Sequence, residues 1–234
     1  MILKHVVPLC EPIITFMIIS SISYKGGVGK TTVAQNLAVC FAHSGYKVCI
    51  VDADELQNSM KWVANRDEEL IQIPVFGQTD SGAIMKNVRS LYEDYEVIII
   101  DSPPTVQKIA SKIILLSHIM LIPITPTGGS EIWTMNDMLE RFQNIQDQKE
   151  EKIHSFFLLN RFKPNVKMHQ AYTEALQEYE EDFGIKLLNS KLHDRAGYGE
   201  ANLQGMGAFE YSNAKAKQEV IDLTNEIIKI SDEI

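Results

Sequence analysis

The chain has 234 residues, of which 45% are hydrophobic and 23% are charged, values that are typical of a globular domain and exclude a largely disordered chain. Its 31 acidic and 22 basic residues give a formal net charge of −9, which argues against a broadly basic nucleic-acid coat protein but leaves room for a local basic patch. No apolar stretch reaches the roughly 20 residues of a membrane-spanning helix. Three cysteines without metal-ligand spacing favour reduced thiols in a cytoplasmic protein.

Short, uninterrupted apolar runs alternate with helical patterns along the chain. Runs of this length are typical of strands buried on both faces of a parallel sheet. They occupy residues 13–23, 47–51, 73–76, 97–100, 119–124 and 156–159. Helical periodicity indicates one helix that ends at Gly45, a second over 167–182 and a third in the C-terminal segment. The alternation predicts a single α/β domain with a mostly parallel, twisted sheet and helices on both faces.

A glycine-rich loop, Lys-Gly-Gly-Val-Gly-Lys-Thr-Thr, follows the first apolar run and opens the first helix. Glycines let successive backbone N–H groups turn toward phosphate oxygens, and the helix N-terminus adds positive partial charge. This context is typical of a P-loop NTPase domain. We expect Lys30 to reach the β- and γ-phosphates and the Thr31 hydroxyl to bind Mg²⁺. The expected nucleotide contacts in this loop are Gly26, Gly27, Val28, Gly29, Lys30, Thr31 and Thr32.

Aspartates end two of the later apolar runs, at the carboxyl ends of predicted parallel strands, where such sheets bind ligands. Four apolar residues precede Asp101, a Walker B pattern that predicts a carboxylate near Mg²⁺. Asp52 and Asp54 follow the run at 47–51. The simpler alternative for these two is that one of them caps the following helix.

The loop resembles the deviant Walker A signature, KGGVGKTT, of the ParA/MinD family of P-loop ATPases, and Tyr24 stands where an ordinary P-loop has its first glycine. The resemblance implies that Lys25 reaches the phosphates of a second protomer in an ATP-dependent homodimer, as an arginine finger does in trans. It assigns Asp54 to orienting the attacking water and Asp52 to the surroundings of Mg²⁺. The implied catalytic residues are therefore Lys25, Lys30 and Asp54, the implied metal-site residues are Thr31, Asp52 and Asp101, and the implied cofactors are ATP and Mg²⁺.

The resemblance departs from the family at residues 55–56, where Glu-Leu replaces the usual Pro-Gln. It extends through residues 122–126, which resemble the strand and turn before a helix that begins near Glu131, to a strand that ends in Asn160. Asn160 is a candidate contact to the nucleotide base, or simply a strand-end cap. Further family positions are Arg195, Tyr198, Ala201, Gly205, Phe209 and Glu210. We expect the ATPase domain over residues 17–234 and an N-terminal extension over residues 1–16, with Met17 as the alternative initiator.

The resemblance, which is strongest to small ParA-type partition proteins, implies an ATP-dependent switch for partition of plasmid or chromosomal DNA. The ATP-bound dimer would bind DNA without sequence preference, and a centromere-binding adaptor would stimulate hydrolysis. Such binding requires basic side chains on phosphates and weakens with salt. Candidate contacts are Arg161, Lys163, Lys167, Lys191, Arg195, Lys215 and Lys217. The implied location is cytoplasmic and nucleoid-associated.

Two alternatives within the family remain open at this point. A MinD-like membrane-positioning ATPase requires a C-terminal amphipathic helix with basic flanks. The tail here is acidic, ending Asp232-Glu233-Ile234, which makes a membrane partner the weaker expectation. A conjugation-linked relative that acts at a transfer origin is the second alternative. Relatives that hold a metal cluster are excluded, because they need cysteines after Asp101 and all three cysteines precede it.

Overall fold

The computed structural model describes residues 16–23, 25–104, 108–128 and 130–234. Of the expected N-terminal extension only residue 16 falls within these ranges, and Tyr24 also lies outside them. The boundary between an extension and the ATPase domain therefore stays a prediction.

A seven-stranded sheet forms the centre of the described part of the chain, and every strand pairing in it is parallel. The strand order is β3-β2-β4-β1-β5-β6-β7. The strands are β1 (Met17–Ser21), β2 (Val48–Asp52), β3 (Val75–Gly77), β4 (Val97–Asp101), β5 (Ile119–Ile124), β6 (His154–Leu159) and β7 (Lys186–Leu187). The predicted α/β fold with a parallel sheet is confirmed.

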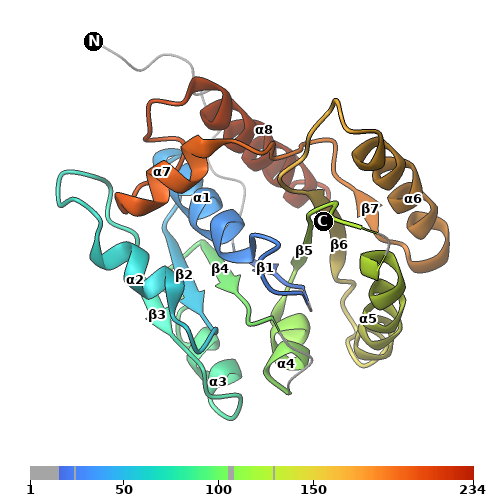
Figure 1. Cartoon of the computed structure of the whole chain (residues 1–234). Helices are drawn as coiled ribbons and strands as arrows, with labels where there is room; N and C mark the ends of the chain where they lie inside the picture. Colours follow the sequence, from blue (N-terminus) through green and yellow to red (C-terminus); the bar gives the residue numbers. More distant parts are fainter. Residues whose placement is uncertain (1–15, 24, 105–107, 129) are drawn as a thin grey trace.

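Helices cover both faces of this sheet (Figure 1). Helices α1, α2, α7 and α8 pack on one face, and α3 to α6 pack on the other. Their bounds are α1 (Lys30–His43), α2 (Asn58–Ala64), α3 (Ile84–Arg89), α4 (Lys108–Leu116), α5 (Ser130–Gln146), α6 (Lys167–Phe183), α7 (Ala196–Leu203) and α8 (Ala214–Ser231). The helices expected at 167–182, near Glu131 and in the C-terminal segment correspond to α6, α5 and α8.

Burial on both faces explains why β1, β2, β4, β5 and β6 appear as continuous apolar runs in the sequence. The run at 73–76 differs, because its strand β3 lies at the sheet edge and is only partly buried. In β1, Ile18 belongs to the core under α3 and α4, whereas Ile19 belongs to the core under α1 and α8. In β4, Ile98 and Ile99 divide in the same way, and all four side chains are fully buried. An alternating polar position would therefore leave a polar group inside one of the two layers.

Helix α1 ends as the sequence predicts. Gly45 follows its last turn in the left-handed region at φ +92°, and its N–H donates to the carbonyl of Ala42. The next N–H, from Tyr46, donates to the carbonyl of Phe41. Glycine at such a position satisfies the last carbonyls of the helix without steric cost and turns the chain toward β2.

Candidate functional site

The glycine-rich loop lies at the carboxyl end of the central strand of the sheet. Strand β1 pairs with β4 on one side and β5 on the other, so the loop that follows it emerges where the strand order reverses. Gly27 and Gly29 have positive φ angles of +77° and +96°. These angles turn the chain from the strand directly into α1, whose N-terminus thus faces the loop.

Lys30 is buried at the start of α1, with only 6% of its surface exposed. Its Nζ donates to the Lys25 carbonyl over 3.3 Å, so the side chain folds back across the loop. Burial lowers the pKa of Lys30, and the carboxylates of Asp101 and Asp54 act in the opposite direction. An ammonium group held in this way provides positive charge where the loop closes on an anion.

Asp101, at the end of β4, accepts a hydrogen bond on each carboxylate oxygen. Thr31 Oγ1 donates to Oδ1 over 3.2 Å, and Ser59 Oγ donates to Oδ2 over 2.9 Å. Burial and the neighbouring Asp52 raise the pKa of Asp101 to about 7, although the two hydroxyl groups and Lys30 act against that rise. Because burial disfavours the charged form of this carboxylate, a cation bound beside it would stabilise that form.

The pair of Thr31 and Asp101 fits the expected Mg²⁺. A hydroxyl and a carboxylate supply hard oxygen atoms, and Mg²⁺ in nucleotide sites takes most of its other ligands from phosphates and water. Among the described residues no cluster of three or more His, Cys, Asp and Glu side chains could hold a metal by itself. Bound by Thr31 and Asp101, Mg²⁺ would neutralise phosphate charge.

Asp52 and Asp54 organise the segment between β2 and α2. Asp52 Oδ2 accepts from the N–H groups of Ser59 and Met60 over 2.8 and 3.1 Å, and its Oδ1 accepts from the Asp54 N–H. The Asp52 carboxylate thus satisfies N–H groups in the first turn of α2, although the residue at the N-cap position is Gln57 and neither aspartate. Asp54 is half-buried, and its Oδ1 accepts from the Leu56 N–H over 2.9 Å. A place for Asp52 beside Mg²⁺ and a water-orienting role for Asp54 stay predictions.

Two further predicted residues, Lys25 in the loop and Asn160 beside it, have hydrogen-bond partners in this structure. Lys25 is exposed, and its Nζ donates to Thr127 Oγ1 over 3.2 Å. Asn160 is buried at the end of β6 and donates from Nδ2 to the Val28 carbonyl over 2.7 Å. Any other residue at Gly29 would be strained at its φ of +96°, and its Cβ, 2.1 Å from that Nδ2, would displace the Asn160 side chain. Asn160 thus supports the loop, and its contact to a base stays a prediction, as does the reach of Lys25 to a partner.

A cleft of about 590 Å³ opens beside the loop. Thr31 and Thr32 form one part of its wall, α2 and α7 form others, and the chain at 193–196 completes it. Asn160 also lines the cleft, which places the candidate base contact next to the loop's threonines. The arrangement combines a phosphate-binding loop with an adjoining cavity of the size of small-molecule sites.

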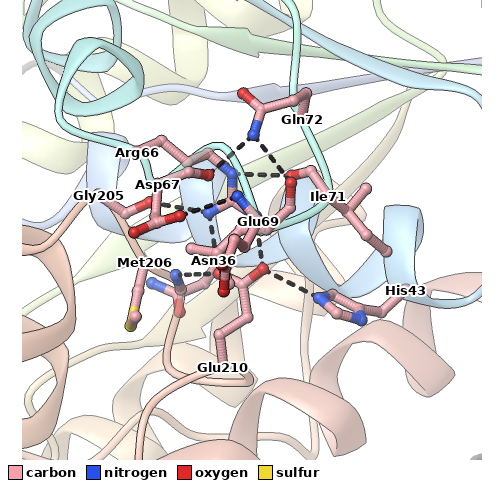
Figure 2. A network of polar contacts seen from close by, with 12 residues as sticks. Asn36, His43, Arg66, Asp67, Glu69, Ile71, Gln72, Gly205, Met206 and Glu210 are labelled. Atoms are coloured by element: carbon pink, nitrogen blue, oxygen red, sulfur yellow. Dashed lines mark hydrogen bonds and ion pairs between the residues drawn. The ribbon is translucent and has the colours of Figure 1, made fainter.

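A buried polar network on the α1 side of the sheet holds the chain after α7 in place (Figure 2). Arg66 donates to both carboxylate oxygens of Glu210, over 2.9 and 2.5 Å, and to the Gly205 carbonyl over 2.8 Å. Asn36, on α1, accepts from the Ala208 N–H and donates to the Thr32 carbonyl. The family positions near residue 210 are thereby tied, through α1, to the end of the phosphate loop.

Several candidate DNA contacts already have partners in this structure. Lys163 pairs with Asp194 over 2.8 Å, and Arg195 Nη2 lies 2.6 Å from Glu219 Oε1. The ammonium groups of Lys191 and Lys217 lie over the rings of Phe162 and Phe209. Within the described ranges, no ion pair or ring contact of this kind is formed by the exposed side chains of Arg161, Lys167 and Lys215.

Sequence reasoning missed two polar residues of the site, Ser59 and Gln35. Ser59 is fully buried and binds Asp101, and Gln35 Nε2 lies 3.5 Å from the Ser59 hydroxyl. A glutamine in the largely apolar helix α1 was the available signal, because buried polar side chains need partners. Which partner it has depends on α2, 24 residues away in sequence.

The sequence matches the family model described as the CobQ/CobB/MinD/ParA nucleotide binding domain over residues 19–208. The match spans most of the chain, so the protein belongs to this family of nucleotide-binding domains, and the resemblance inferred from the loop is confirmed.

The chain is also similar to individual proteins of this kind. It is 26% identical over 208 residues to the maintenance of carboxysome distribution protein A of Halothiobacillus neapolitanus, covering 87% of this chain and 93% of that protein. It is 25% identical over 177 residues to protein ParA of Rhizobium radiobacter, covering 75% of this chain and 78% of that protein. Among solved structures, septum site-determining protein MinD from Pyrococcus horikoshii, complexed with Mg-ADP, superposes with a TM-score of 0.71 at 23% identity, covering 92% and 97%. Nucleotide binding is thus confirmed at the level of the family, and a solved structure with the same fold holds Mg-ADP.

Proposed function

We propose that the chain is an ATPase that acts as a positioning switch, closing into a homodimer with ATP and binding DNA without sequence preference in that state. The observation that carries the proposal is the pair of lysines on the phosphate loop. Lys30 is buried inside the loop, whereas Lys25 is exposed beside it. A second, outward lysine adds little to a site that one protomer completes alone, but it can neutralise phosphates across a dimer.

The named relatives support positioning as the general task. One is named for carboxysome distribution and another is a ParA protein. The cargo of this chain, its adaptor and its nucleoid association belong to the proposal. A centromere-binding adaptor that stimulates hydrolysis would reset the switch and release the DNA.

Helix α8 favours DNA over a membrane as the surface that the switch binds. Its apolar side chains Val220, Leu223 and Ile227 are buried in the core shared with α1, so they are not available to insert into lipid. A membrane-associated amphipathic helix must expose such a face. No helix in the part of the chain that the structure describes is long and apolar enough to cross a membrane.

The test measures retention on random-sequence DNA at low salt with ATP and Mg²⁺, with ADP in a parallel sample. We expect ATP-dependent retention whose logarithm falls linearly with the logarithm of salt concentration, with a slope of about −0.9 for each phosphate neutralised. Lys167→Ala and Lys215→Ala should each reduce the magnitude of that slope by about 0.9, the value expected for the loss of one phosphate contact. Lys47→Ala, at the amino end of β2 and away from the loop, is the matched control.

Absence of DNA retention with ATP at low salt would refute the DNA part of the proposal. Flotation with anionic liposomes distinguishes the alternative, because ATP-dependent flotation without DNA retention would identify a membrane-positioning ATPase instead.

A further inference from the structure

A chain of side-chain hydrogen bonds runs from α7 to the aspartate at the end of β4. Asn202 Nδ2 donates to Gln35 Oε1 over 2.7 Å. Gln35 Nε2 in turn donates to Ser59 Oγ over 3.5 Å. Ser59 Oγ then donates to Asp101 Oδ2 over 2.9 Å. Four elements that are far apart in sequence are thereby joined at the candidate Mg²⁺ site.

The donor and acceptor atoms of each side chain determine the direction of this series of hydrogen bonds. The Gln35 oxygen accepts from Asn202, so the amide nitrogen of Gln35 faces Ser59. A serine hydroxyl has a single proton. Because Gln35 donates to the hydroxyl oxygen, the proton of Ser59 is directed to Asp101. Every donor in the chain therefore points toward the carboxylate.

Ser59 differs from the other hydroxyl on Asp101. Thr31 is expected to bind Mg²⁺ through its own oxygen, so its contact to Asp101 changes when the site fills. Ser59 lies on the opposite oxygen, is fully buried and has no expected contact with nucleotide or metal. Its backbone N–H is also fixed, by Asp52 at 2.8 Å. The hydroxyl is thus presented from a rigid helix start.

We propose that Ser59 is a positioning residue for the magnesium half of the site. Its hydroxyl holds the Asp101 carboxylate in one orientation, and Gln35 keeps that hydroxyl turned toward Asp101. The inference rests on the proposed function, since it concerns the affinity of the nucleotide site for Mg²⁺. Groups that orient a metal-binding side chain commonly change metal affinity by about 10- to 100-fold when removed.

The experiment measures binding of a fluorescent ATP analogue to the full chain, first in EDTA and then during a Mg²⁺ titration. For Ser59→Ala we expect binding in EDTA within about twofold of wild type and a Mg²⁺ midpoint raised roughly tenfold. Ser59→Thr, which keeps a hydroxyl, should recover most of the shift. Ser155→Ala is the matched control, because Ser155 is also buried but lies near the amino end of β6.

A Mg²⁺ midpoint of Ser59→Ala within twofold of wild type would overturn the inference. So would an equal loss of binding in EDTA, which would mean that Ser59 shapes the phosphate loop and not the metal site. If Ser59→Ala does not fold, Gln35→Leu replaces it, with a midpoint raised roughly threefold in support and an unchanged midpoint in refutation. A wild-type chain that fails to bind the analogue under both conditions would instead refute the proposed function.

Discussion

Glu210 lies on the α1 side of the sheet, and only 3% of its side-chain surface is exposed. Burial alone would raise its pKa, but hydrogen bonds from His43, Arg66 and the Gly207 N–H outweigh that effect and hold the pKa at about 2. The folded-state value lies below the unfolded one of 4.5. The stabilisation is therefore complete above about pH 4.5 and is lost as the pH falls from there toward 2.

Glu210→Gln should destabilise the protein by about 3–5 kcal/mol at pH 7, because it leaves the Arg66 guanidinium buried without its counter-charge. For a chain of this length the melting temperature should fall by about 10 °C. The difference from wild type should shrink between pH 4.5 and pH 2. This difference in stability is measured by thermal unfolding at several pH values, with circular dichroism as the signal. Glu233→Gln, on an exposed position, is the control, and a difference that does not vary with pH would contradict the role of the charge.

Lys30→Ala and Lys25→Ala should separate two functions of the phosphate loop. Without the buried Lys30 ammonium the loop loses its charge for the phosphates, so nucleotide binding should become undetectable in calorimetry. Lys25→Ala should keep nucleotide binding within a fewfold of wild type while dimer formation with ATP is lost, as measured by light scattering. Equal loss of binding in both variants would contradict the assignment of Lys25 to the dimer.

The residues of the phosphate loop could be predicted because their chemistry is local in sequence. The glycines, Lys30 and Thr31 lie within a few positions of one another, and the adjoining strand and helix are visible as patterns. Arg66 and Ser59 could not be found in this way. Arg66 meets Glu210 across 144 positions, and Ser59 meets Asp101 across 42, so only the tertiary structure brings them together.

Among the elements, the turn after α7 depends on one glycine. Gly205 has φ +66°, and a Cβ there would lie 2.5 Å from the backbone nitrogen of Arg66. Gly205→Ala should therefore cost both backbone strain and a displacement of the 65–66 segment, about 2–4 kcal/mol in all. Gly45→Ala is a matched control with φ +92° and open space, for which about 1 kcal/mol is expected. Urea denaturation compares the two, and equal midpoints would contradict the close approach.

Element prediction succeeded where an element is fully buried or strongly periodic. The runs at 97–100 and 119–124 correspond to β4 and β5 almost residue for residue, because both faces of these strands are covered. Helices α2 and α3 have only seven and six residues, too few for a clear period. Strand β7 has two residues on the sheet edge, and its pairing with β6 follows from tertiary structure alone.

At the scale of the whole molecule, a chain with a charge of −9 must confine any hold on DNA to a small surface. Pairing of Lys163 and Arg195 with acidic neighbours reduces that surface further in the single protomer. In the proposed function, a dimer would double the number of exposed basic groups, and DNA affinity would then depend steeply on the nucleotide state.

Asp54→Ala should trap the ATP-bound dimer. If Asp54 orients the attacking water, its removal leaves ATP binding intact and slows hydrolysis by about 10²-fold or more. Size-exclusion chromatography with light scattering should then show a persistent dimer with ATP and a monomer with ADP. Wild-type hydrolysis rates in this variant would remove Asp54 from the proposed mechanism.

The parallel arrangement of all seven strands also determines which backbone amides respond to a ligand. The loops at the carboxyl ends of β1, β2 and β4 carry the candidate site, while the strands themselves are covered on both faces. A nucleotide should therefore slow hydrogen–deuterium exchange in residues 25–32 and 53–59 and leave the already protected central strands nearly unchanged. Nucleotide binding would then change the local opening of the loops at one edge of the sheet, while the shape of the sheet itself would stay the same.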